Sequence, residues 1–262
     1  DGAGNVQALP LQKTGAAFYN VDQHQTATAL RFSATSTTLG LSLEVEIVAP
    51  FRPGDERVSC VPAYVMNFRI RRRDRVRWNR AKEGASRQGT LRFGLRMPET
   101  AVRSSGGRIR LDEEVRVPVR RVSGEGGGNA VHDARERRTP AEGKASSLVM
   151  PLEGPWKARN GLIEARYDVS EAGGEAEFSA ALVGWCGDAL FERFGQPMRL
   201  KYTALWKSLD DVAAYVAKNH RRLVAAAREF DALFENPNVP AALADLTAIS
   251  LQIGRASCRE RV

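Results

Sequence analysis

Residues 41–48 read LSLEVEIV, and this stretch decides the fold. Its apolar and polar residues alternate without a break: Leu41, Leu43, Val45 and Ile47 against Ser42, Glu44 and Glu46. Because successive side chains of a β-strand point to opposite faces of the sheet, a period of two is typical of a strand with one buried face. The stretch therefore predicts a half-buried strand.

The same pattern recurs along the chain between about residues 26 and 183. Alternating segments lie at 64–70, 91–97, 115–119 and 162–167, and a more continuously apolar run at 178–185 is typical of a central strand. Breakers separate them: Pro50, Pro53-Gly54, Gly106-Gly107 and Gly173-Gly174. The arginines between the apolar positions are interpreted as a solvated sheet face. These features predict an antiparallel β-sandwich over residues 1–200.

One stretch inside this region lacks large apolar residues. Residues 123–147 are rich in glycine and in charges of both signs, and the sequence predicts a long flexible loop here. The glycine cluster at 126–128 precedes no apolar helix and lacks the lysine of a phosphate-binding loop, which argues against a nucleotide site.

The period changes at Ser208. Ser208 and Asp211 have the spacing of a helix N-cap, and apolar residues then recur at helical spacing over some seven turns: Leu209, Val212, Ala213, Val216, Leu223, Ala227, Phe230 and Leu233. Asn236-Pro237 is expected to end this helix, and Pro240 to open another over 241–249. Residues 201–252 are thus predicted to be a linker and the first helices of an α-helical domain, with the apolar face of the long helix partly uncovered.

The last ten residues, IGRASCRERV at 253–262, match one reading frame of a common short-read sequencing adapter, codon for codon. We interpret them as translated adapter and exclude them from fold reasoning. The sequence opens at Asp1 without an initiator methionine, so we expect a fragment of a longer protein, and an export signal stays open.

Charge and composition exclude several classes of protein. The net charge of the 262 residues is +8, to which 253–262 contribute three arginines and one glutamate. The other arginines alternate along strands instead of clustering with aromatic residues, so we expect no nucleic-acid partner. No apolar run is long enough to span a membrane. Apart from Cys258 the cysteines are Cys60 and Cys186, which favours a reducing compartment such as the cytoplasm; two buried thiols are preferred to a disulfide.

The sequence offers no catalytic or metal-binding constellation. His24, His132 and His220 are widely spaced and lack metal-ligand spacing. Adjacent carboxylates occur at Glu113-Glu114 and Asp210-Asp211, and the second pair is explained by the N-terminus of the long helix. We therefore predict no catalytic, cofactor or metal residue in this chain, and the sequence leaves substrate-binding residues unknown.

Three tryptophans leave a carbohydrate-binding function open. Trp156, Trp185 and Trp206 could stack on sugar rings, although packing inside the sandwich or between domains is the preferred interpretation. A self-standing carbohydrate-binding β-sandwich is the alternative reading of the whole chain. It would predict a row of exposed aromatic residues and a chain that ends soon after its last strand.

Two segments carry a resemblance to a known family. The first is VAPFRPGD at 48–55 followed by SCVPAYVMNF at 59–68; the second is YTALW at 202–206, DDVAAYV at 210–216, then Leu223, Phe230 and Pro240 before Leu243. They resemble the N-terminal β-domain and the domain junction of glycoside hydrolase family 116, the family of the non-lysosomal glucosylceramidase, also called bile-acid β-glucosidase. Together they cover about a third of the chain.

The resemblance implies a parent enzyme with an (α/α)6 barrel, of which this chain would hold only the first helices. It implies a retaining β-glycosidase acting on a β-glucoside or related sugar, with a nucleophile and an acid/base carboxylate inside the barrel. No residue of this chain matches either role, so the chain itself is expected to be inactive. The sandwich would pack on the missing barrel. Pro50 to Asp55 is the candidate loop for the rim of the substrate cleft, although an ordinary interstrand turn is the preferred interpretation.

Overall fold

A computed structural model of the chain describes residues 19–36, 41–72, 90–96, 102–105, 107–119, 139–159, 162–168, 175–188, 191–193 and 196–235, with residues 238, 240, 242, 243 and 246. Its strands are β1 (Tyr19–Gln25), β2 (Ala29–Ser36), β3 (Leu41–Val48), β4 (Ala63–Arg72), β5 (Thr90–Arg96), β6 (Val102–Ser105), β7 (Arg108–Val119), β8 (Thr139–Glu153), β9 (Trp156–Arg159), β10 (Leu162–Asp168), β11 (Glu175–Cys186), β12 (Phe191–Arg193) and β13 (Gln196–Met198). The helices are α1 (Glu56–Ser59), the 3-10 helix η3 (Lys201–Ala204) and α2 (Leu209–Asp231).

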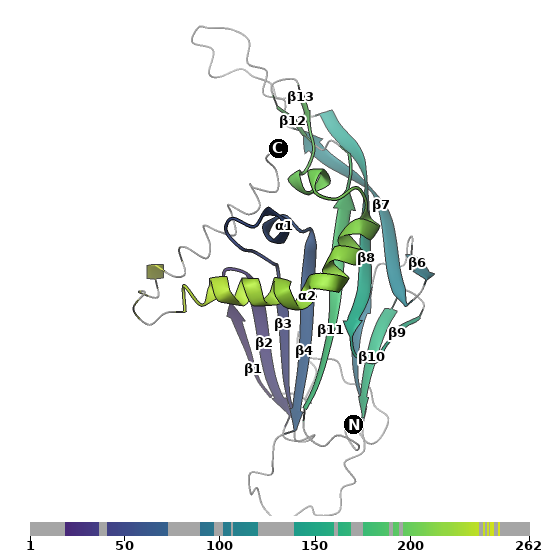
Figure 1. Ribbon diagram of the computed structural model, residues 1–262. Coiled ribbons are helices and arrows are strands. Elements are labelled where there is room, and N and C mark those ends of the chain that lie inside the picture. The colour runs from purple at the N-terminus through teal and green to yellow at the C-terminus, as the bar shows by residue number, and fades with distance from the viewer. Residues whose placement is uncertain are drawn as a thin grey trace, which may run out of the picture.

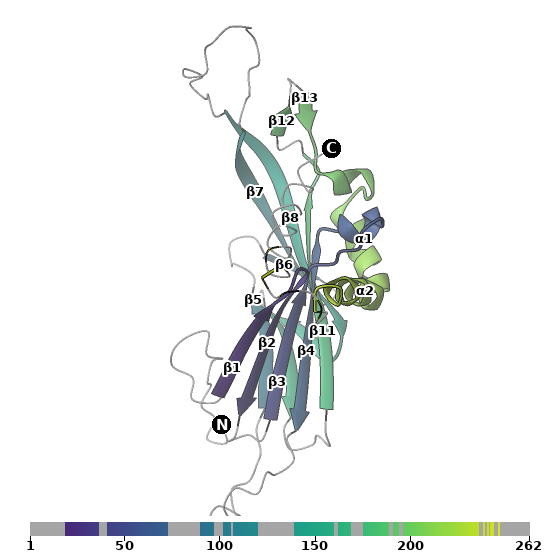
Figure 2. The same ribbon diagram turned by 90° about the vertical axis from the view of Figure 1, so that its left-hand side faces the viewer.

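An antiparallel sheet of eight strands forms the body of the protein, in the order β1-β2-β3-β4-β11-β8-β7-β6 (Figure 1). A second sheet, β5-β10-β9, packs on one face of it, and β12 and β13 form a separate hairpin. Helices α1 and α2 lie together on one side of the large sheet (Figure 2). The predicted mainly-β sandwich followed by the start of a helical region is confirmed.

The two faces of the large sheet bury different residues, as the alternation predicts. Phe68 of β4 and Phe178 of β11 face the small sheet, where Ala165 of β10 and the half-buried Trp156 complete the core between the sheets. The opposite face presents Val65 and other apolar residues to the helices. The segments at 41–47, 64–70, 162–167 and 178–185 thus lie in the strands that the sequence predicts.

Helix α2 covers the middle of the other face of the sheet (Figure 1). Its apolar side chains share one hydrophobic core with β4, β8 and β11: Leu209, Val212, Ala213, Val216, Leu223, Val224, Ala226 and Ala227. Each is at most 7% exposed. The expectation that this helical face would be partly uncovered is therefore wrong, because the sheet itself covers it.

The helix ends agree with the sequence in one case and differ in the other. The Ser208 side chain accepts a hydrogen bond from the Asp211 N–H at 3.1 Å and caps α2 as predicted. The helix ends at Asp231, so Leu233 lies outside it and is 62% exposed instead of buried. In the predicted second helix, Ala242, Leu243 and Leu246 are helical.

The predicted loop at 123–147 needs a correction. Residues 139–147 form the first part of β8, which pairs with β7 from Thr139↔Val119 onward and with β11 from Ala145↔Cys186 onward. Small residues such as Gly143 hide this strand from a hydrophobicity pattern. The ladder with β7 supplies backbone partners from Thr139, and the ladder with β11 adds partners from Ala145 onward. Residues 123–138 lie outside the described residues, as do residues 253–262.

Candidate functional site

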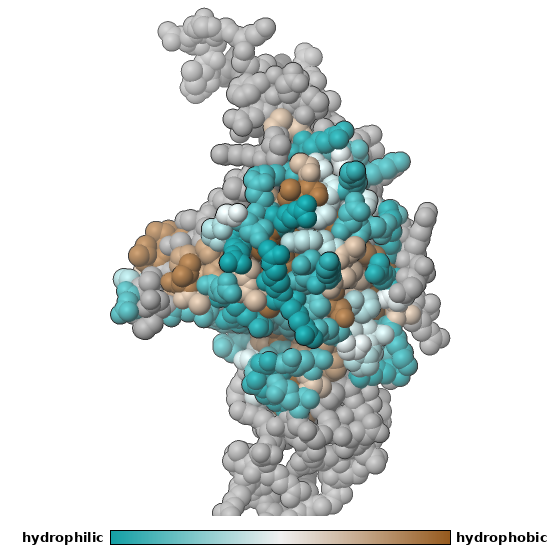
Figure 3. All heavy atoms as spheres, in the orientation of Figure 1, coloured by the Kyte–Doolittle hydropathy of each residue, from teal (hydrophilic) through white to brown (hydrophobic). Residues whose placement is uncertain are grey.

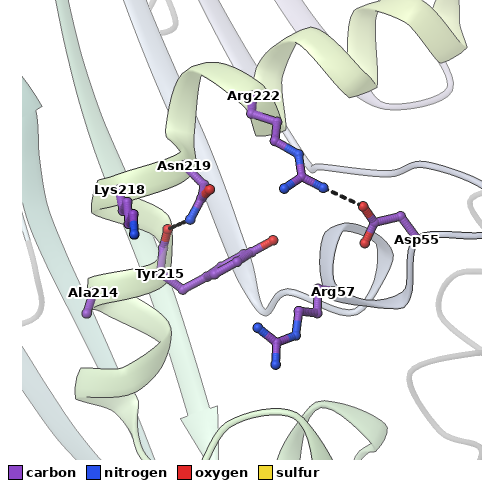
Figure 4. Close-up of a pocket in the computed structure, with 7 residues that line it drawn as sticks. All are labelled: Asp55, Arg57, Ala214, Tyr215, Lys218, Asn219 and Arg222. Carbon is purple, nitrogen blue, oxygen red and sulfur yellow. Dashed lines mark hydrogen bonds and ion pairs between the residues drawn. The ribbon is translucent and has the colours of Figure 1, made fainter.

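The segment between β3 and β4 meets helix α2 at a hollow on the surface, which we call the α1–α2 hollow. It has a volume of about 450 Å³ and is lined by Asp55, Arg57, Ala214, Tyr215, Lys218, Asn219 and Arg222 (Figure 4). Of these, Asp55 belongs to the first segment that carries the family resemblance, and Ala214 and Tyr215 belong to the second. Figure 3 shows that hydrophilic side chains dominate this face of the molecule. Hydrophobic ones gather beyond the end of α2, where Leu233, Leu243 and Leu246 are exposed.

A tight turn shapes one wall of the hollow. The Asp55 N–H donates to the Arg52 carbonyl at 3.1 Å, with Pro53 and Gly54 at the two central positions. Pro53 has the fixed φ that the first central position needs, and Gly54 has the positive φ of 79° that a type II turn needs at the second. The turn places Asp55 directly before α1.

Asp55 uses its two carboxylate oxygens for different purposes. Oδ1 accepts a hydrogen bond from the Val58 N–H at 3.1 Å and so caps α1. Oδ2 accepts one from Arg222 of α2 at 2.7 Å, which joins two segments 167 residues apart. The same carboxylate therefore fixes the short helix and ties it to the long one.

Further contacts hold the two segments together. The ring of Phe51 meets that of Phe230 edge to face, with centroids 4.9 Å apart. Val58 of α1 and Val61 after it are fully buried in the core that also contains Trp206 and the apolar face of α2. This shared core fixes α1 against α2.

Tyr215, Lys218 and Asn219 approach the hollow from α2, where residues three and four apart share a face. The Asn219 side chain donates to the Tyr215 carbonyl at 2.8 Å. The Tyr215 ring stacks obliquely on buried Trp206, and its hydroxyl extends between Arg57 and Arg222 (Figure 4). Burial raises the pKa of this phenol above its ordinary value, against the opposing effect of Arg222. The phenol therefore stays protonated at neutral pH and can donate a hydrogen bond.

The structure places the predicted rim loop, Pro50 to Asp55, at this hollow. The loop is the connection between β3 and α1, and its residues Phe51 and Asp55 contact α2. It lies within the connection between the neighbouring strands β3 and β4, as the interpretation of an interstrand turn requires. Its place at the rim of a substrate cleft stays a prediction.

The histidines do not come together as a metal site. His24 lies exposed on β1, His220 lies half-buried on α2, and His132 is outside the described residues. His220 Nε2 lies 3.1 Å from Glu153, which also pairs with Arg221. Hydrogen bonds from His220 and Arg221 lower the pKa of Glu153. Among the residues that the structure describes, no group of three or more potential ligands could hold a metal ion.

Of the two pairs of adjacent carboxylates, Asp210-Asp211 lies where the sequence predicts. Asp210 and Asp211 lie in the first turn of α2, where Asp211 also accepts a hydrogen bond from the Lys207 N–H at 3.0 Å. This is the position at which the helix macrodipole favours negative charge. Glu113 and Glu114 are neighbours on β7, and their side chains lie outside what the structure describes.

Within the part of the chain that the structure describes, Cys60 and Cys186 form no disulfide. Cys186 is buried at the end of β11, and Cys60 is half-buried after α1. Tyr202 fixes the backbone of Cys186, because its hydroxyl accepts from the Cys186 N–H at 2.8 Å. The expectation of two buried thiols is met by Cys186, whereas Cys60 is only half-buried.

The three tryptophans serve packing. Trp206 is 6% exposed, and Trp185 packs obliquely against Tyr202 with centroids 5.3 Å apart. Trp156 lies between the sheets against Phe68 and Phe178. Within the described residues these tryptophans form no exposed row for stacking on sugar rings.

Two clusters of polar side chains could not be predicted from the sequence patterns. Buried Asp231 accepts hydrogen bonds from both Thr26 and Thr28. Half-buried Glu46 binds Arg31 at 3.2 Å and also pairs with Arg228. Each cluster joins residues about 200 positions apart, so no local spacing could reveal it.

Comparison with known proteins leaves the family open. No model of a protein family matches the chain, and no curated protein matches it. Solved structures do match, among them a protein from the human microbiome with the provisional description of a kojibiose phosphorylase. The alignment has a TM-score of 0.37 and 11% identity, and it covers 83% of this chain and 25% of the other. This chain thus spans about a quarter of the length of that protein. Within the described residues, no helix is long and apolar enough to cross a membrane.

Proposed function

We propose that this chain is the non-catalytic β-sandwich domain, with the first helices of the helical catalytic domain, of a retaining β-glycosidase of the β-glucosidase or glucosylceramidase type. One observation carries the proposal. The two segments that resemble family 116 lie about 150 residues apart in the sequence, and here they pack against each other. Asp55 binds Arg222, and Phe51 meets Phe230.

A chance resemblance in two unrelated surface loops would not require this contact. In the family relationship we propose, residues 48–68 form the part of the sandwich that receives the first long helix of the barrel. Val58 and Val61 from the first segment share a core with Trp206, Leu209 and Val212 from the second, which fits such a junction. The sandwich would then brace the barrel, and a β-glucoside would bind outside this chain.

Two of the described glutamates, Glu46 and Glu153, suit a structural role. A glycosidase acid needs a raised pKa so that it still carries its proton near neutral pH. Arg228 lowers the pKa of Glu46 despite the opposing effect of burial, and His220 and Arg221 lower that of Glu153. Neither glutamate is therefore suited to protonate a leaving group.

The alternative is a self-standing carbohydrate-binding sandwich. It would need exposed aromatic platforms, whereas Trp156 and Trp206 are engaged in packing. The core that α2 shares with the sheet also favours a domain junction over an isolated module.

The test is to isolate the complete gene that contains this sequence and to assay its product on aryl β-glucosides and glucosylceramide. We expect turnover by the complete protein and none by residues 1–252 alone above a no-protein control. Turnover by the short chain that disappears on mutating one of its own carboxylates would refute the non-catalytic role. A complete product that binds polysaccharide without cleaving any glycoside would favour the carbohydrate-binding alternative.

A further inference from the structure

The α1–α2 hollow carries more positive charge than its own residues balance. Its lining holds three cationic side chains, Arg57, Lys218 and Arg222, and a single carboxylate, Asp55. Asp55 is already bound to Arg222 and caps α1 with its other oxygen. The lining therefore has a net charge of +2.

Two of the cations have no partner among the residues that the structure describes. Arg57 lies on α1, two residues after the capping residue Asp55, and Lys218 lies one turn before Arg222 on α2. Neither cation forms an ion pair within the described residues. By contrast, Arg69, Arg71 and Arg228 on the same side of the sheet are each paired with glutamates. Arg57 and Lys218 thus differ from these three arginines, whose charges are balanced by glutamates.

A neutral hydrogen-bond donor, the Tyr215 hydroxyl, also belongs to the lining of the hollow. The hydroxyl of Tyr215 has no hydrogen-bond partner within the described part of the chain, and Figure 4 shows it between the guanidinium groups of Arg57 and Arg222. The Tyr215 ring packs against Trp206, and the Asn219 side chain donates a hydrogen bond to the Tyr215 carbonyl. Both contacts hold the residue in place. The donor is consequently preorganised without a ligand.

We propose that the α1–α2 hollow binds a phosphate group. A phosphate monoester carries nearly two negative charges at pH 7, which matches the net charge of the lining. Its three terminal oxygens can accept from the planar fork of Arg57, the ammonium group of Lys218 and the Tyr215 hydroxyl. A carboxylate has one charge and two oxygens, so it would leave one cation and one donor of the hollow unused.

The shared chemistry is the phosphate group, whether as inorganic phosphate or on a small organic ester. The hollow is open and its cations are exposed, so the complex should be weak and sensitive to salt. All residues of the hollow belong to this chain. A failure of the phosphate test would therefore leave the glycosidase proposal unaffected, and the reverse also holds.

The experiment is a series of melting curves of the full 262-residue chain in rising phosphate at pH 7.5, with chloride balancing the ionic strength. A ligand that binds the folded state raises the melting temperature by mass action, and the dependence on concentration gives Kd. We expect phosphate to raise the melting temperature where chloride does not. R57A and K218A should each weaken binding about fivefold, because each removes a charge-assisted hydrogen bond.

A matched control and a second ligand complete the design. Lys207→Ala removes an exposed lysine from the start of the same helix, outside the hollow, and should keep the phosphate effect. The doubly substituted R57A/K218A chain should lose the phosphate effect, whereas Y215F should weaken phosphate binding by only about threefold.

A second ligand distinguishes the two sources of phosphate. Tighter binding of methyl phosphate than of inorganic phosphate would identify an ester as the ligand. Equal or weaker binding of methyl phosphate would identify inorganic phosphate as the ligand. An equal rise in phosphate and chloride, or an undiminished rise in R57A/K218A, would overturn the proposal.

Discussion

The carboxylate of Asp231, in the last turn of α2, accepts a hydrogen bond from the backbone N–H of Thr28 at 3.0 Å. The Thr28 hydroxyl donates to the other oxygen at 2.7 Å, and the Thr26 hydroxyl donates to that oxygen at 2.6 Å. Asp231 is 1% exposed. The last turn of the long helix is thereby fixed to the turn between β1 and β2.

Replacing Asp231 with alanine should lower the free energy of unfolding by about 3 kcal/mol, because it leaves the Thr28 N–H without its acceptor. The Thr26 and Thr28 hydroxyls also lose their shortest hydrogen bond and keep the longer ones to the carbonyls of Ala29 and Ala227. The measurement is urea denaturation followed by circular dichroism. Glu229→Ala, at an exposed position of the same helix, is the control and should change stability by less than about 0.5 kcal/mol. Equal losses in the two variants would contradict the structural role of Asp231.

The two functions of Asp55 can be separated by substitution. Asp55→Asn keeps a side-chain oxygen for the Val58 N–H but loses the charge that pairs with Arg222, so we expect a loss of about 0.5 kcal/mol. Asp55→Ala loses the cap as well and should cost about 1.5 kcal/mol. Thermal unfolding measures both losses. In an Arg222→Ala background, Asp55→Asn should cost almost nothing; an unchanged loss there would contradict the ion pair.

Much of the fold could be predicted from local patterns. The alternation at Leu41 and Leu43 locates a buried face, and Ser208 with Asp211 locates the start of α2. Such patterns work where one side of an element is apolar. They fail for β1 and for the first part of β8, because backbone ladders create those strands without an apolar face.

The polar clusters could not be predicted for a different reason. An aspartate in the last turn of a helix is disfavoured by the macrodipole, so the sequence of α2 gives no hint that Asp231 is important. Only the distant Thr26 and Thr28 explain it. The α1–α2 hollow is similar, since Asp55 and Arg222 are brought together by the packing of α2 on the sheet.

Acid should weaken the fold through Glu46. Burial raises the pKa of this carboxyl, but Arg228, Asn67 and Arg31 outweigh that effect and hold the pKa below its ordinary value of 4.5. The unfolded chain therefore takes up a proton at higher pH than the folded chain. The stabilisation is complete above about pH 4.5 and is lost as the pH falls through the lower pKa of the folded state.

The measurement is the melting temperature between pH 6 and pH 3. Glu46→Gln should lower it at pH 6, and the difference from the unmodified chain should shrink towards pH 3. Glu44→Gln alters a more exposed glutamate on the same strand, whose ion pairs with Arg69 and Arg71 contribute little. A constant gap between the unmodified chain and Glu46→Gln across this range would contradict the prediction.

The two described thiols should differ in reactivity. Burial raises the pKa of the Cys186 thiol, which lowers the fraction of reactive thiolate, and Tyr202 packs over the same end of β11. Cys60 is half-buried, so reagents reach it more easily. We expect iodoacetamide at pH 8 to modify Cys60 at least about tenfold faster than Cys186 in the folded chain.

Peptide mass spectrometry after timed quenching measures both rates of modification, and in urea the two rates should converge. Removing the Tyr202 hydroxyl by Tyr202→Phe should loosen the end of β11 and raise the rate at Cys186 without changing that at Cys60. Equal rates in the folded, unmodified chain would show that the end of β11 is open to solvent and would contradict the packing described for Cys186.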